Sequence, residues 1–219
     1  MEDLSQLFNI VVLGDMNPRI HTPAWYRLID LIDDEEMEES VRATTTMSIP
    51  PAAQVQLTRI LIQCLQHRWE IRTRDANKLQ RMKSITAKVF DELLKHTPVS
   101  AMGFNFDFQR PTGIAVGPFL AECLAKLPLD LSGENLLSGE MSIRRSQEDH
   151  TIQVKLRAAS DHGKERVLVV ENNYEYRFEN KYHDFFNLAD MIEARFDSDM
   201  GDAESRTDRI LESIEKMAE

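Results

Sequence analysis

The chain has 219 residues, of which 42% are hydrophobic and 29% are charged. This composition is ordinary for a folded protein that buries a core, and it argues against global disorder. No apolar run approaches the roughly 20 residues of a membrane helix, and the N-terminus is acidic where a signal peptide is basic. Cys64 and Cys123 lie among apolar residues without metal-ligand spacing, which favours buried thiols in a reducing compartment. We therefore expect a cytoplasmic protein with no metal site, no cofactor and no membrane segment.

The net charge of −11 is unevenly distributed along the chain. Residues 1–40 carry two basic and ten acidic side chains, a net charge of −8. Residues 41–178 carry nineteen and fifteen, a net charge of +4, and residues 179–219 carry five and twelve, a net charge of −7. Two explanations stay open: the acidic ends keep the protein soluble, or they pack electrostatically on the middle, within one chain or between copies.

The first 40 residues predict a strand followed by a helix. The run Asn9–Gly14 is apolar and rich in β-branched residues and ends at glycine, which favours a buried strand. Thr22 and Pro23 are typical of a helix start, with the threonine as N-cap and the proline in the first turn. The apolar stripe expected in this helix consists of Trp25, Leu28, Ile29 and Ile32. The acidic block 33–39 opposes the dipole at a helix C-terminus, so we expect the helix to end near Asp33 and the block to be exposed.

The next segments predict strands. Thr44–Ile49 is rich in β-branched residues and precedes two prolines, which favours an edge strand. Residues 57–73 alternate between apolar and polar side chains, which predicts an extended segment. The alternation shifts phase near Cys64, which indicates either a bulge or a turn between two strands, at His67-Arg68 if there are two.

A helix and a strand complete a strand–helix–strand core over residues 57–108. Apolar residues recur at three- and four-residue steps over Ala76–Lys95, after Asp75 as an N-cap, which predicts an amphipathic helix. Phe104, Phe106 and Phe108 then follow at period two, so we expect them to share one buried face of a strand.

The second half of the chain predicts a short helix over 118–127, a β-meander over 138–178 and two C-terminal helices. Asn172-Asn173 within the meander favours a turn or a bulge. Apolar stripes over 182–196 and 204–217 predict the two helices, because the pattern breaks around Gly201. The stripe of the second helix is narrow and suits docking on a neighbour. It consists of Ile210, Leu211, Ile214 and Met217.

These patterns together predict an α+β protein with mainly antiparallel sheet or sheets and packed helices. Residues 1–109 form an N-terminal α/β half, and residues 110–219 form the meander with its helices. The two halves are either separate domains or one continuous domain, and the sequence leaves both arrangements open.

One compact set of polar residues follows the first strand. It contains an acid, an amide, a guanidinium and an imidazole, namely Asp15, Asn17, Arg19 and His21. Because α/β proteins commonly place sites at the ends of strands, these are the candidate catalytic residues. The turn chemistry of an Asp-x-Asn-Pro sequence, however, explains Asp15 and Asn17 without any function.

A second candidate site is the basic segment 59–95, which holds nine lysine and arginine residues against four acidic ones. Arg72, Arg74, Lys78 and Arg81 are the candidate binding residues, for nucleic acid or for an acidic partner. The low isoelectric point, about 5.1, opposes long-range attraction to phosphates.

We therefore expect a cytoplasmic protein-interaction or scaffold protein without catalytic chemistry, which binds a protein partner or forms a homo-oligomer. The alternatives are an enzyme with its site at residues 15–21, and nucleic-acid binding through residues 59–95.

Overall fold

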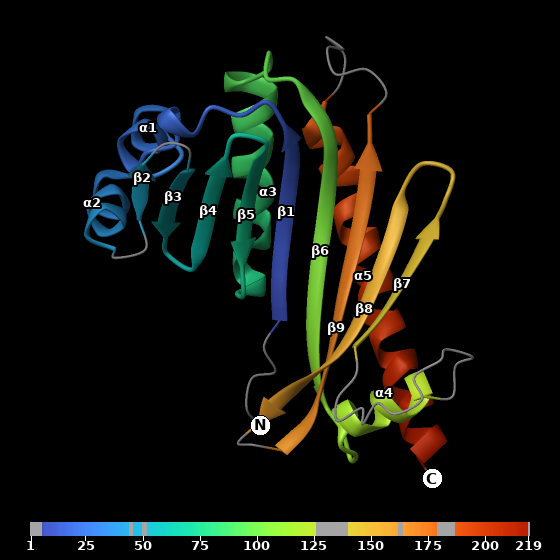
Figure 1. Ribbon diagram of the computed structural model, residues 1–219. Coiled ribbons are helices and arrows are strands. Elements are labelled where there is room, and N and C mark those ends of the chain that lie inside the picture. Colours follow the sequence, from blue (N-terminus) through green and yellow to red (C-terminus); the bar gives the residue numbers. More distant parts are fainter. Residues whose placement is uncertain are drawn as a thin grey trace. The chain divides into compact units, whose positions relative to one another are not determined.

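The computed structural model describes residues 6–43, 46–49, 52–125, 140–161, 164–178 and 187–218. It confirms the α+β class: an antiparallel sheet with packed helices that ends in a long helix (Figure 1). The strands are β1 (Gln6–Gly14), β2 (Met47–Ile49), β3 (Ala52–Leu57), β4 (Ile60–Leu65), β5 (Arg68–Thr73), β6 (Val99–Pro111), β7 (Glu140–Ser146), β8 (Thr151–Asp161) and β9 (Lys164–Arg177). The α-helices are α1 (Pro23–Leu28), α2 (Asp34–Arg42), α3 (Leu79–Ala87), α4 (Val116–Ala125) and α5 (Leu188–Ala218).

The chain divides into two compact units, which are described separately. The first unit comprises Leu7–Asn105 and Glu175–Ser198, and the second comprises Met1–Gln6, Phe106–Tyr174 and Asp199–Glu219. Strands β1, β6 and β9 and helix α5 contribute residues to both units. The division of the chain near residue 109 into two halves stays a prediction.

The sheet of the first unit has the strand order β2-β3-β4-β5-β1-β6-β9. A row of buried apolar residues crosses four of these strands in antiparallel register. It consists of Val55, Ile62, Ile71 and Ile10. β1 ends at Gly14, where a Cβ atom would clash with the carbonyl of Pro98, so the close approach of this segment requires glycine. β2 lies at the edge of the sheet, as its neighbouring prolines predict.

Helix α3 packs on β5 and lies within the amphipathic segment Ala76–Lys95 that was predicted to be helical. Asp75 caps the short 3₁₀ segment η2 (Ala76–Lys78) that precedes it, by accepting a hydrogen bond from the backbone N–H of Asn77. The helix continues as a π-helical segment, η3 (Lys88–Leu93). Phe90 lies edge-to-face on Trp69 of β5, with ring centroids 5.2 Å apart, and both rings are buried.

The alternating segment 57–73 is not one strand. The phase shift near Cys64 reflects two strands, β4 and β5, joined by a turn. Gln66 and His67 form this turn, one residue earlier than the predicted His67-Arg68, because Arg68 already begins β5 and pairs with Leu65. A second turn, at Thr58–Arg59, separates β4 from β3, which the sequence did not predict as a strand. Arg59 has a positive φ of 60°, as tight hairpin turns require.

The prediction for the first helix was right at its start and wrong at its end. Thr22 caps α1 by accepting a hydrogen bond from the N–H of Trp25, with Pro23 in the first turn. The helix ends at Leu28, and Asp30 has a positive φ of 55°. The residues that α1 buries are Pro23 and Tyr26, whereas Leu28 is 79% exposed.

The acidic block after α1 forms a helix of its own. Asp33 caps α2 by accepting a hydrogen bond of 2.8 Å from the N–H of Glu36. The acids therefore lie at a helix N-terminus, where the dipole favours negative charge, and not at a C-terminus as the sequence suggested. Glu36 is buried, so the block is only partly exposed.

The sheet of the second unit has the strand order β6-β9-β8-β7. β7 and β8 pair in antiparallel register, with Met141 opposite Leu156, as a meander requires. Helix α4 packs on both of these strands. Asn172-Asn173 does not make the predicted turn, because β9 continues through these residues to Arg177 and Asn172 is buried. The alternative, a bulge at this position, stays a prediction.

The two predicted C-terminal helices are one helix. α5 runs without interruption from Leu188 to Ala218, and Gly201 lies inside it. The start of the predicted stripe at 182–186 lies outside the described residues. The buried face of α5 is continuous because polar and small residues fill it where large apolar residues are missing. These residues are Asp199, Ala203 and Thr207.

Within the part of the chain that the structure describes, none of the helices combines the length and the apolar character that crossing a bilayer requires.

The N-terminus of α5 is held by a carboxylate from a distant part of the chain. Asp91 accepts hydrogen bonds from the N–H groups of Leu188 (2.9 Å) and Ala189 (2.7 Å). We expect Asp91→Ala to lower the free energy of unfolding by about 1 kcal/mol, because it leaves two helix donors without this acceptor. Urea unfolding measures the effect. Glu92→Ala, at the exposed neighbouring position, should change it by less than about 0.5 kcal/mol. Equal losses in the two variants would contradict the capping role.

Candidate functional site

The structure separates the four polar residues that follow β1. Asp15, Asn17 and Arg19 are exposed, whereas His21 is buried. The Asn17 side chain caps the short 3₁₀ segment η1 (Pro18–Ile20) by accepting a hydrogen bond of 3.2 Å from the N–H of Arg19. The local role of Asn17 is therefore the turn chemistry that its sequence indicates.

His21 belongs to a buried aromatic cluster of the first unit. Its Nδ1 lies 2.8 Å from the hydroxyl of Tyr26, which accepts a hydrogen bond of 3.4 Å from Nε1 of Trp69. Burial lowers the pKa of His21 to about 4 and raises the pKa of Tyr26. At neutral pH the imidazole is uncharged, and its Nδ1 shares a hydrogen bond with the hydroxyl of Tyr26. This hydrogen bond holds the buried ring of His21 in place, and the lowered pKa keeps the imidazole from titrating near pH 7.

Of the basic candidates, Arg81 has a partner inside the first unit. Its guanidinium donates hydrogen bonds of 2.8 and 2.5 Å to the carboxylate of Glu36 on α2, and one of 3.3 Å to the carbonyl of Leu31. Arg72 lies 3.9 Å from Glu70. Arg81 therefore fixes α2 to α3, and binding of an outside partner by Arg72, Arg74 and Lys78 stays a prediction.

The acidic ends of the sequence contact its basic middle within one chain. Arg81 pairs with Glu36 of the N-terminal acidic segment. Lys83 lies 3.0 Å from Asp197 of the C-terminal acidic segment, also in the first unit. In the second unit, Arg110 lies 3.1 Å from Asp208. Of the two explanations for the uneven charge, these ion pairs support electrostatic packing of the ends on the middle.

A pocket of about 260 Å³ lies in the second unit, between α4, β7, β8 and α5. Its apolar wall includes Phe119 and Leu120 from α4, Met141 from β7, Leu156 from β8, and Ile214 and Met217 from α5. The thiol-bearing residue Cys123, which is in no disulfide, also lines it. The volume is below the roughly 300–1,000 Å³ of sites for drug-sized ligands, so the pocket suits one or two apolar side chains or a single acyl chain.

Two arginines supply the charge of the pocket lining. Arg206 and Arg209 both line it, together with Ser213, and no acidic residue is among its described lining residues. The side chain of Arg209 is exposed. Its Nη1 donates a hydrogen bond of 3.2 Å to the hydroxyl of Ser205, and Arg209 makes no ion pair with the described residues. The positive charge at this wall is therefore available to a ligand.

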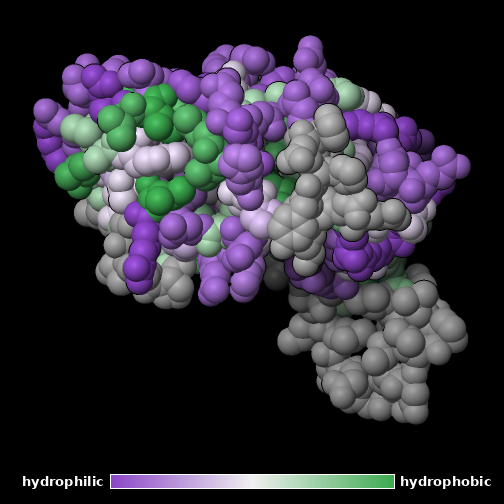
Figure 2. Space-filling model, turned by 90° about the horizontal axis from the view of Figure 1, so that it is seen from above, coloured by the Kyte–Doolittle hydropathy of each residue, from purple (hydrophilic) through white to green (hydrophobic). Residues whose placement is uncertain are grey.

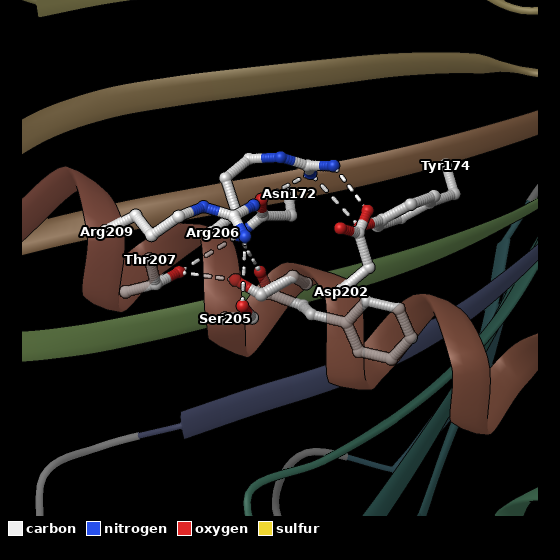
Figure 3. A network of polar contacts seen from close by, with 9 residues as sticks. Asn172, Tyr174, Asp202, Ser205, Arg206, Thr207 and Arg209 are labelled. Carbon is white, nitrogen blue, oxygen red and sulfur yellow. Dashed lines mark hydrogen bonds and ion pairs between the residues drawn. The ribbon is translucent and has the colours of Figure 1, made fainter.

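Arg206, by contrast, is bound in a polar network between α5 and β9 (Figure 3). Its Nη1 donates hydrogen bonds of 3.1 Å to the Asn172 side-chain oxygen and to the Tyr174 hydroxyl. Its Nη2 donates to Asp202 at 2.5 Å, and the Tyr174 hydroxyl donates to the same carboxylate at 2.9 Å. The guanidinium also lies over the Tyr174 ring, 5.6 Å from its centroid.

The buried end of this network is saturated. The Asn172 amide nitrogen donates to the carbonyl of Phe106 (3.4 Å) and to the hydroxyl of Thr207 (3.5 Å). The Thr207 hydroxyl in turn donates to the carbonyl of Ala203. Burial raises the pKa of Tyr174, so the phenol stays protonated at neutral pH. The network fastens α5 to β9 through hydrogen bonds between Arg206, Asn172 and Tyr174.

A further apolar surface lies on the first unit. Figure 2 shows hydrophobic side chains gathered at the end of this unit where α1 lies, with hydrophilic residues around them. The exposed large hydrophobic residues described in the unit are Leu28, Val41, Met47, Leu65 and Leu93. Leu28, the last residue of α1, is the most exposed of these residues, at 79%.

Among the described residues, no group of three or more histidine, cysteine, aspartate and glutamate side chains is arranged to hold a metal ion. Burial raises the pKa of the Cys64 thiol to about 12, so this cysteine is not a thiolate nucleophile near neutral pH.

No protein-family model matches the sequence, and a search of curated proteins finds no match.

Sequence reasoning missed the network and the arginine pair. Two signals were present: Asn172 shares the period-two face of Tyr174 and Tyr176 on β9, and Thr207 continues the buried stripe of α5. Both were overlooked because a search for apolar residues assigns asparagine to turns and threonine to the outer face of a helix.

The buried His21 makes the stability of the fold depend on pH. Its pKa is about 4 in the folded protein and about 6.5 when unfolded, so between these values the unfolded chain binds a proton that the folded chain does not. Stability is therefore lost as the pH falls from 6.5 to 4, by about 3 kcal/mol. The free energy of unfolding, measured by urea unfolding at several pH values in this range, should fall less steeply with decreasing pH in His21→Gln than in the wild type. His67→Gln, at an exposed position, should keep the wild-type slope.

The two pocket arginines should differ in their effect on stability. Arg206→Met leaves the oxygen of Asn172 and the carboxylate of Asp202 without their donor, so we expect a loss of about 2 kcal/mol. Arg209→Met should change stability by less than about 0.5 kcal/mol, since Arg209 is exposed. Urea unfolding of both variants checks the difference. A loss in Arg209→Met as large as that in Arg206→Met would contradict the assignment.

Proposed function

We propose that this chain is a cytoplasmic interaction protein without catalytic chemistry, and that it binds a protein partner at the pocket of the second unit. The observation that carries the proposal is the apolar wall contributed by α4, β7, β8 and α5, with Met217 of that wall 64% exposed. Apolar surface that stays accessible in a folded protein marks sites of interaction. Burial of an apolar side chain from a partner in this pocket supplies the free energy of docking.

The chemistry of the polar groups supports a binding role over a catalytic one. His21 is uncharged near pH 7 and buried, and Tyr174 is held as a neutral phenol between Arg206 and Asp202. General acid–base catalysis needs a group whose pKa lies near the working pH and that reaches the substrate. The unpaired thiols Cys64 and Cys123 support a reducing compartment such as the cytoplasm.

A second copy of the chain is the partner that we test first. Most soluble oligomers are homo-oligomers, and the narrow apolar stripe at the end of α5 lies in the pocket wall through Ile210, Ile214 and Met217. Self-association also needs no further component, so it is measured on the purified chain.

Size-exclusion chromatography with light scattering tests this proposal. The mass of the wild type should rise with concentration above the 25.3 kDa of one chain. Met217→Glu places a carboxylate in the apolar wall and should weaken association about tenfold or more. Ala194→Glu adds the same charge at an exposed position of α5 in the first unit and should leave the mass unchanged.

Two results would contradict the proposal. A wild-type mass of one chain at every concentration removes self-association. A Leu28→Glu variant that abolishes association, while Met217→Glu does not, moves the docking surface to the α1 end of the first unit.

A further inference from the structure

The pocket of the second unit has one feature that docking of an apolar side chain does not use. Arg209 lines it with a guanidinium that forms one hydrogen bond, to Ser205, and no ion pair with the described residues. The acids that precede Arg209 on this stretch of α5 are paired with other arginines. Asp202 pairs with Arg206, and both Glu204 and Asp208 pair with Arg110. An apolar wall with one unneutralised cation at its edge matches a ligand that is apolar with one anionic end.

We propose that this pocket binds a medium-chain aliphatic carboxylate, with the acyl chain against the apolar wall and the carboxylate on Arg209. This inference goes beyond the proposed function, because the ligand is a small molecule and its binding does not require a partner protein. The two occupants use the same wall, so the carboxylate competes with the docked partner.

The size of the pocket sets the length of the chain. At about 30 Å³ for each water-sized group, 260 Å³ takes roughly nine such groups. This corresponds to an acyl chain of about eight to ten carbons. A nucleotide or a flavin is too large for this volume, and the wall offers neither the several donors nor the glycine-rich loop that phosphate groups require.

The chemistry of the rim selects a carboxylate as the head group. A guanidinium presents its donors in a planar fork that matches the two oxygens of a carboxylate. Arg206 is not assigned this role, because its charge is already paired with Asp202 and its Nη1 donates to Asn172 and Tyr174. The network instead holds Arg206 in place, and Arg206 lines the pocket together with Arg209.

Isothermal titration calorimetry on the full chain tests the inference, with hexanoate, octanoate and decanoate below their micelle concentrations. Each added methylene should tighten binding about fourfold until the pocket is full. Arg209→Gln should weaken decanoate binding about tenfold and leave the binding of 1-decanol, which has no charge, unchanged. Arg42→Gln, at an exposed arginine of the first unit, serves as the control for the loss of one positive charge.

A second pair of variants tests the location. Ser213→Phe places a ring in the pocket and should abolish decanoate binding, whereas Ser198→Phe, at an exposed serine of α5 in the first unit, should not. No binding of decanoate to the wild type overturns the inference, and so does equal affinity in Arg209→Gln and the wild type. A protein that is monomeric at every concentration but binds decanoate as described contradicts only the proposed function.

Discussion

The fold depends on the burial of one face of α5 against the aromatic residues of β6 and β9. In the first unit, Phe196 of α5 lies edge-to-face on Phe104 of β6, with centroids 5.3 Å apart. In the second unit, α5 meets β9 through the contacts of Arg206 with Asn172 and Tyr174. Each buried aromatic side chain contributes roughly 1.5–3 kcal/mol, so the apolar contacts supply most of the free energy and the polar contacts fix which residues face each other.

This division of roles explains why a cluster rich in titratable groups is not the candidate site. Asp202, Arg206 and Tyr174 satisfy one another, so the loss of any one of them leaves its partners without their hydrogen bonds, which is costly. The adjacent turn of α5 carries Arg209, whose charge meets no acid in the described residues. The binding role that we propose therefore involves Arg209, whose guanidinium forms a single hydrogen bond to Ser205, and does not involve the paired residues of the network.

The sequence predicted the elements whose pattern depends on local chemistry. The period-two phenylalanines Phe104, Phe106 and Phe108 are all buried, and the caps at Thr22 and Asp75 form as expected. These predictions succeeded because a cap needs only residues within one turn, and an alternating strand needs only a sheet with one covered face.

The failures arose where distant residues decide the structure. Gly201 and the acids around it indicate a break, but packing on the sheet keeps α5 helical through them. Asp91, which lies almost a hundred residues before α5 in the sequence, caps the start of this helix. Glu36 of α2 accepts hydrogen bonds from Arg81 of α3. The pocket draws its wall from four elements, so no local pattern reveals it. The narrow apolar stripe on α5 could be predicted, because the three- and four-residue spacing of apolar residues is visible in the sequence without knowledge of what the stripe contacts.

The continuity of α5 is the feature of the fold that departs most from the sequence pattern, and hydrogen exchange measured by mass spectrometry tests it most directly. In one continuous helix, the backbone amides of residues 197–202 are hydrogen-bonded, and they should exchange as slowly as those of the flanking turns. Exchange of these amides at the rate of an unstructured peptide would show two helices joined by a linker, and it would contradict the account.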